Sequence, residues 1–127
     1  MNADKDCEGL LYLTWSQFDS PDQPGSGYKF MERDCVQLLD RVTHKTKMIL
    51  NIQLGYVSPK YARMKGMTTF DSHRVGKAVR IRIKCKKKRM KLVAALILEG
   101  VRRIAIDREL IYFDTDDQKQ DEMPLWC

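Results

Sequence analysis

The sequence predicts one α+β domain, with a small, mostly antiparallel sheet and helices packed on it, because three local patterns follow one another along the chain. Apolar residues recur at helical spacing over 32–45, alternate with polar ones over 78–84, and form two short runs at 101–106 and 110–113. These elements show no repeated β-α-β unit, which disfavours a parallel sheet. With 127 residues the chain is long enough for one apolar core and too short for two ordinary domains.

The first half of the chain predicts a helix and a strand, preceded by less regular segments. Residues 1–9 are polar and expected to be flexible, residues 10–15 form a short apolar element, and the Pro/Gly-rich residues 19–27 form a loop. The predicted helix 32–45 has one buried stripe, made of Cys35, Val36, Leu38, Leu39 and Val42. Residues 48–54 predict a buried strand.

The middle of the chain predicts a turn and then a strand with two different faces. Residues 55–59 form the turn, 60–67 a short helix or irregular loop, and 68–73 carry no pattern that predicts their backbone. In the strand 78–84, side chains alternate between a core face and a basic face, because successive residues of a strand point to opposite sides. The core face holds Val79, Ile81 and Ile83, and the other face holds Ala78, Arg80, Arg82 and Lys84.

A second helix and a hairpin are predicted to complete the domain. The helix covers 88–99 and is expected to bury a stripe made of Met90, Val93, Ala94, Ile97 and Leu98. Gly100 stands where a left-handed residue ends a helix. The runs 101–106 and 110–113 then form a hairpin around residues 107–109.

Composition argues against an exported, membrane-bound or disulfide-rich protein. The chain shows neither an export signal nor a stretch of roughly 20 apolar residues, so we expect a cytoplasmic protein with no membrane partner. Its four cysteines stand far apart without a C-x-x-C pair, which disfavours a zinc ribbon or a disulfide framework. We therefore expect reduced thiols.

Positive charge is concentrated in one part of the chain. Lysines and arginines outnumber acids by six overall, and nine of them lie between residues 77 and 91 without one acid. This run is either a solvated face or a binding face for an anionic ligand. Nucleic-acid binding is the alternative function that it suggests, although no aromatic residue lies between Phe70 and Tyr112 to stack on bases.

Motifs spread over residues 13–126 resemble those of the zinc D-alanyl-D-alanine carboxypeptidases. The matching positions are Gly55, Tyr56, Ser58 and Pro59 in a polar turn, Ser72, His73, Gly76 and Ala78 in a metal motif, and Asp114 and Trp126 near the end. The resemblance implies a Hedgehog/DD-peptidase-like fold covering the whole chain as one domain, 1–127. It also suggests a compact protein of the kind carried by bacteria and small phages.

The departures from this family pattern fall on the metal site. Arg80 stands where the family has its ligand aspartate, and Tyr112 stands where it has its last ligand histidine, so His73 is the sole surviving ligand. A catalytic zinc needs three protein ligands and an open water position, and an arginine adds a positive charge instead of a ligand. We therefore expect no zinc and no catalytic residue. Glu109 is the candidate remnant of a general base, or only an acid in a hairpin turn.

These departures predict a catalytically inactive relative, retained as a binding or structural module for an unknown protein or peptide partner. The alternatives are a zinc peptidase that cuts peptidoglycan peptides through a rearranged site, with Asp71, His73 and Asp114 as substitute ligands, and the nucleic-acid binder described above. The candidate binding residues are Arg80, Arg82, Lys84, Asp114, Tyr56 and Trp126. Arg80 is expected either to pair with Asp114 or Asp71, beside Tyr112, or to reach into solvent.

Overall fold

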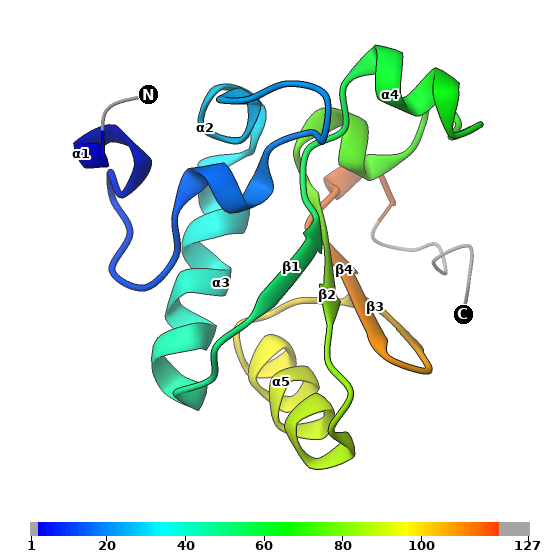
Figure 1. The fold of residues 1–127 in the computed structure, drawn as a ribbon. Helices are drawn as coiled ribbons and strands as arrows, with labels where there is room; N and C mark the ends of the chain where they lie inside the picture. Colours follow the sequence, from blue (N-terminus) through cyan, green and yellow to red (C-terminus); the bar gives the residue numbers. More distant parts are fainter. Residues whose placement is uncertain (1–2, 120–127) are drawn as a thin grey trace.

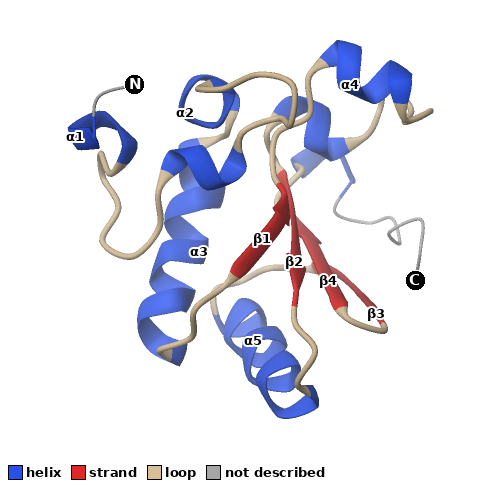
Figure 2. Cartoon of the chain, viewed as in Figure 1, coloured by secondary structure: helices blue, strands red, loops and turns tan. Residues whose placement is uncertain are grey.

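The computed structural model of the protein describes residues 3–119 and confirms the α+β class (Figure 1). Four strands form one antiparallel sheet in the order β1-β2-β4-β3 (Figure 2). The edge strands are therefore β1 and β3, and β4, the last strand along the chain, lies inside the sheet. The strands are β1 (Asn51–Leu54), β2 (Ala78–Arg82), β3 (Arg103–Asp107) and β4 (Leu110–Asp114). The predicted hairpin is present as β3 and β4, whereas the finer Hedgehog/DD-peptidase architecture stays a prediction.

Two long helices cover one face of this sheet and form the main core with it. α3 (Arg33–Thr46) buries the predicted stripe around Val36, Leu39 and Val42, and it packs beside α5 (Lys86–Leu98) (Figure 1). Both helices meet alternate side chains of β2 and β4, namely Val79, Ile81, Ile111 and Phe113, all fully buried. The predicted apolar face of the strand at residues 78–84 is therefore confirmed.

The stripe that α5 buries differs from the predicted one. Leu92, Ala95 and Leu96 face the core, whereas Met90 and Ile97 are exposed. The reason is that the second half of α5 carries apolar residues on all sides, so spacing alone does not identify the face that meets the sheet. The end of the helix was predicted correctly, because Gly100 has the positive φ of 93° that favours glycine there.

From residue 3 to α3 the chain contains only short helices and is held to α3 by side-chain hydrogen bonds. The first helix, α1 (Ala3–Asp6), lies within the segment 1–9 that was expected to be flexible. Residues 10–15 were expected to form a regular element, but the first one in this region is the short 3-10 helix Trp15–Phe18. The backbone N–H groups of residues 11–13 all donate to the buried carboxylate of Asp40 on α3, at 2.9 Å each. Asp19 similarly accepts from Gly25 and Gly27 at the start of α2 (Ser26–Phe30), so the Pro/Gly-rich loop is ordered.

The predicted buried strand at 48–54 is shorter and less buried than expected. β1 begins only at Asn51 and lies at the edge of the sheet, where Asn51 and Gln53 are exposed and Leu54 is buried. The exposed residues Asn51 and Gln53 are polar, so an edge strand can leave them in contact with water while Leu54 is buried.

The second face of the sheet is covered near one end by the loops that follow β1. These contain α4 (Pro59–Met64), the short 3-10 helix Ser72–Val75 and a tight turn at Gly76 (Figure 1). Gly76 has a φ of 72°, and a Cβ added there would collide with the carbonyl oxygen of Phe30. The backbone of Gly76 in turn accepts a hydrogen bond from the N–H of Glu32, so this turn joins the second face to the start of α3.

Candidate functional site

His73 lies in a buried position where its backbone and its ring are both fixed. Asp71 caps the short helix by accepting from the backbone N–H of His73, and the His73 carbonyl accepts from the N–H of Val57. The ring atom Nδ1 lies 2.7 Å from the carbonyl oxygen of Gly55. A carbonyl can only accept, so Nδ1 carries the proton and Nε2 presents a lone pair.

The imidazole of His73 is held in its neutral form. Burial lowers its pKa, and the charge of Arg80 acts in the same direction, while Asp71, Asp114 and the Gly55 carbonyl oppose the shift. Nε2 has no hydrogen-bond partner among residues 3–119. The ring makes an edge contact with Tyr112, with 5.6 Å between ring centroids, so this nitrogen is part of a buried cluster and does not face solvent.

A buried ion pair occupies the centre of the cluster. The Nε of Arg103 lies 3.0 Å from both carboxylate oxygens of Asp114, and the hydroxyl of Tyr112 donates to the same carboxylate at 2.6 Å. Arg103 is 6% exposed and Asp114 is fully buried. Burial, followed by the hydrogen bond to Asp114 and the charge of that residue, raises the pKa of Tyr112 well above its usual value. The phenol therefore stays a hydrogen-bond donor at any physiological pH.

The register of the hairpin explains why these side chains meet. Arg103 lies directly opposite Asp114, and Ala105 lies opposite Tyr112. Directly opposed residues share a face of the sheet, with Cβ atoms about 5 Å apart. On the other side of β4, Ala78 pairs with Asp114. The small side chains of Ala78 and Ala105 leave room for the Tyr112 ring that they pack against.

A second aspartate extends the network toward the His73 loop. The hydroxyl of Ser72 donates to Asp116 at 2.8 Å, and the backbone N–H of Asp116 donates to Asp114 at 3.3 Å. Ser72, Asp116 and Asp114 are all buried. The loop that carries His73 is thus tied to β4 and the residues that follow it through hydrogen bonds.

Four of the residues singled out in the sequence come together here. His73, Tyr112 and Asp114 contact one another directly or through the network, and Arg80 is the cross-strand neighbour of Tyr112 on β2. Arg80 is half-buried and close enough for its charge to act on His73. The salt bridge that the structure shows for Asp114 is made by Arg103; the pairing of Arg80 with Asp114 or Asp71 stays a prediction.

The other predicted site residues lie elsewhere. Arg82 is exposed at the opposite end of β2, which stops there and not at residue 84 as predicted, and Lys84 is exposed just beyond it. Glu109 lies in the hairpin turn, where its carboxylate pairs with Arg82 at 2.9 Å. Tyr56 is buried and stacks on Phe30 with 4.8 Å between ring centroids. Trp126 lies outside the described residues.

Sequence reasoning missed Arg103 and Asp116 as members of the cluster, and it named Ser72 only as a motif position beside His73. Arg103 could have been found from the hairpin, because pairing 107 with 110 across a two-residue turn places 103 opposite 114. The expected turn had three residues, at 107–109, and this choice would have placed Arg102 opposite Asp114. No comparable signal exists for the contact between Ser72 and Asp116, which spans 44 positions of the chain.

The residues at this centre do not fit a zinc ion. Zinc needs deprotonated or neutral donors, yet Tyr112 keeps its proton and Arg103 engages both oxygens of Asp114. His73 offers one lone pair, and the nearby Arg80 brings a positive charge that acts on His73. Within residues 3–119, no group of three or more histidine, cysteine, aspartate or glutamate side chains is arranged to hold a metal.

Comparisons of the chain with protein-family models, curated proteins and solved structures return no match. Among the helices of residues 3–119, none combines the length and the apolar character that a membrane crossing requires. The cysteines described by the structure, Cys7, Cys35 and Cys85, are free thiols.

Proposed function

We propose that this chain is a non-catalytic relative of the zinc D-alanyl-D-alanine carboxypeptidases, retained as a binding or structural module. The observation that carries the proposal is the buried network of Arg103, Asp114 and Tyr112, which lies beside His73. In the carboxypeptidases that the chain resembles, a zinc ion would join two strands and the histidine loop in this region. Here a guanidinium and a carboxylate join β3 to β4, and Ser72 and Asp116 attach the loop.

Burial further supports a structural role for this centre. His73 is 1% exposed, Tyr112 is 7% exposed and Asp114 is not exposed at all. A general base must come within about 3 Å of the proton that it removes, or act through one water. A substrate peptide therefore has no direct access to the lone pair of His73 past the described residues. The same burial makes the fold depend on the pairing, because removing one partner of a buried ion pair leaves an uncompensated charge in the interior.

The proposal is tested by metal content and peptidase activity measured on one preparation. Freshly purified chain, dialysed without a chelator, is expected to contain far less than one zinc per molecule and to leave peptides ending in D-alanyl-D-alanine uncleaved. Zinc that stays near one equivalent through dialysis, together with release of D-alanine, would establish the rearranged zinc peptidase instead.

A second experiment tests the resemblance on which the proposal rests. The double variant Arg80→Asp/Tyr112→His restores the two ligand positions and also removes the phenol that donates to Asp114. We expect it to bind zinc measurably more tightly than the matched variant Arg82→Asp/Tyr112→His, because Arg82 is exposed at the other end of β2. Equal zinc affinities of the two folded variants would show that Arg80 does not stand at a ligand position.

A further inference from the structure

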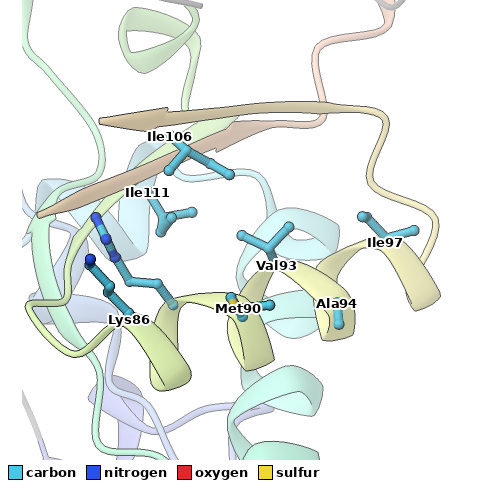
Figure 3. Close-up of a pocket in the computed structure, with 8 residues that line it drawn as sticks. Lys86, Met90, Val93, Ala94, Ile97, Ile106 and Ile111 are labelled. Atoms are coloured by element: carbon cyan, nitrogen blue, oxygen red, sulfur yellow. The ribbon is translucent and has the colours of Figure 1, made fainter. Parts of the chain in front are cut away.

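An apolar groove runs between α5 and the hairpin of β3 and β4, on the face of the sheet opposite the His73 cluster. Its volume is about 410 Å³, and its walls are formed by Lys86, Arg89, Met90, Val93, Ala94, Ile97, Ile106 and Ile111. Figure 3 shows Ile106 and Ile111 reaching from the hairpin toward α5, while Met90, Val93 and Ile97 line the helix below them. Side chains from two elements thus make one concave surface.

The helix beneath this groove has two apolar stripes, of which residues 3–119 cover only one. Leu92, Ala95 and Leu96 pack into the core. The second stripe, Met90, Ala94 and Ile97, is spaced at i, i+4 and i+7 and lines the groove. Its two large side chains are 74% and 57% exposed, and Ile106 across the groove is 56% exposed. A helix that is apolar on two faces is normally covered on both, so the second stripe indicates a docking surface.

Positive charge surrounds one end of the groove. Lys86 and Arg89 line that end, and Arg89 is fixed there by donating to the backbone carbonyl oxygens of Asp107 and Arg108 in the hairpin turn. The neighbouring Lys87, Lys88 and Lys91 are exposed. Across residues 3–119, none of the lysines between positions 84 and 91 forms an ion pair. The first turn of α5 adds the positive end of its helix dipole, so this end of the groove favours carboxylates.

We propose that this groove binds an amphipathic, acidic helix of a partner protein. The lining from Lys86 to Ile97 spans about 17 Å at the rise of an α-helix, which matches about three turns of a partner helix. Apolar side chains of the partner lie against Met90 and Ile97, and its carboxylates meet Lys86 and the lysines beside it. The flexible thioether of Met90 suits such a surface, because it adapts to the side chains that it meets.

The shape and composition of the surface favour a helix over a membrane or a nucleic acid. A helix that lies on a membrane buries one whole apolar face in the lipid, whereas here the apolar side chains of α5 line a groove walled on the other side by the hairpin. A nucleic acid would use the lysines but has no use for the isoleucines of the groove, and none of the lining residues is aromatic. The inference goes beyond the proposed function, since the groove and the His73 cluster lie on opposite faces and their tests are independent.

A designed peptide can serve as the probe. It is a fluorescein-labelled helix of about 14 residues, with leucines at i, i+4 and i+7 and glutamates in its first turn. The control peptide carries lysines in place of the glutamates. We expect the acidic peptide to bind the full chain with a Kd below about 100 μM, measured by fluorescence anisotropy, and to bind more weakly as salt rises from about 0.1 M to about 0.5 M. The basic peptide should bind at least about tenfold more weakly.

Variants of α5 separate the groove from the rest of the helix. Met90→Gln and Ile97→Gln should each weaken binding about tenfold, because each removes one apolar contact. Leu98→Gln is the matched control, since Leu98 is 82% exposed on the same helix but does not line the groove. Lys86→Gln should weaken binding and reduce its salt dependence more than Lys91→Gln does. Circular dichroism confirms that each variant remains folded.

Several results would overturn the inference. One is the absence of binding at about 100 μM peptide, and another is an equal loss in the Ile97→Gln and Leu98→Gln variants. Tighter binding of anionic lipid vesicles or of RNA than of the acidic peptide, unaffected by Met90→Gln, would assign the basic end of α5 to those ligands instead.

Discussion

The buried ion pair leads to the most specific stability prediction for this protein. Replacing Arg103 with methionine removes the guanidinium but keeps an unbranched apolar side chain in place of the arginine's apolar stem. Asp114 then remains fully buried, with the Tyr112 hydroxyl and the Asp116 N–H as its donors but without its salt bridge. A buried carboxylate that loses its cation is strongly unfavourable, so the folded state is selectively destabilised.

The expected loss is about 3 kcal/mol of unfolding free energy, at the lower end of the range for a broken buried pair, because two hydrogen-bond donors remain. At a urea dependence of about 2 kcal/mol per M, this loss lowers the unfolding midpoint by ~1.5 M. Circular dichroism at 222 nm during urea titration near neutral pH measures it, at wavelengths dominated by α3 and α5.

Two further variants determine whether the loss comes from the buried charge. Arg82→Met breaks the exposed pair with Glu109, whose side chains are 46% and 44% exposed, and should cost less than about 0.5 kcal/mol. Adding Asp114→Asn to Arg103→Met removes the stranded charge and should recover about 1 kcal/mol or more. The reasoning is refuted if Arg103→Met is no more destabilising than Arg82→Met, or if Asp114→Asn brings no recovery in the Arg103→Met background.

Three other predictions concern His73, a glycine turn and the cysteines. Because burial lowers the pKa of His73 below 6.5, the unfolded chain binds more protons than the folded one just below that pH. The free energy of unfolding should therefore fall as the pH drops from 7 toward 5, and it should fall less steeply in the His73→Gln variant. The same pH dependence in both proteins would contradict this. Gly76→Ala should cost more than about 1 kcal/mol of unfolding free energy, and clearly more than Gly66→Ala, since both have positive φ but only the first lacks space for a Cβ. Cys85 is exposed, and its thiol pKa is lowered by backbone N–H groups of the next turn and by nearby lysines, whereas burial raises the pKa of Cys35 to about 12. A thiol reagent at pH 7 should therefore label Cys85 rapidly and Cys35 only after unfolding. Comparable labelling rates would contradict the buried placement of Cys35.

Local periodicity in the sequence was sufficient for the elements with one clear apolar face. The stripe of α3 and the alternation in β2 meet the core as predicted, and the two apolar runs after α5 pair as the predicted hairpin. In α3 and β2 most of the remaining positions are polar, so only one orientation buries the apolar side chains. The class of the fold follows from the order of these elements.

The orientation of α5 was decided only by the tertiary structure. Its sequence contains two apolar stripes, and the predicted one, around Met90 and Ile97, lies on the exposed side. Leu92 and Leu96 face the core, where they pack in one cluster with side chains of α3 and the sheet. Where a helix is apolar on all sides, as in the second half of α5, its sequence does not distinguish the face that meets the core from a face that binds a partner.

The candidate site shows the same division between local pattern and tertiary structure. The motif resemblance identified His73, Arg80, Tyr112 and Asp114 as residues to examine, and the antiparallel sheet brings them to one face. The cation that pairs with Asp114 depends on the register of the hairpin, where a shift of one residue exchanges Arg103 for Arg102. The sequence by itself determined which residue types were available; the backbone pairing decided that Arg103 became the buried partner, because side chains on adjacent positions of a strand point to opposite faces.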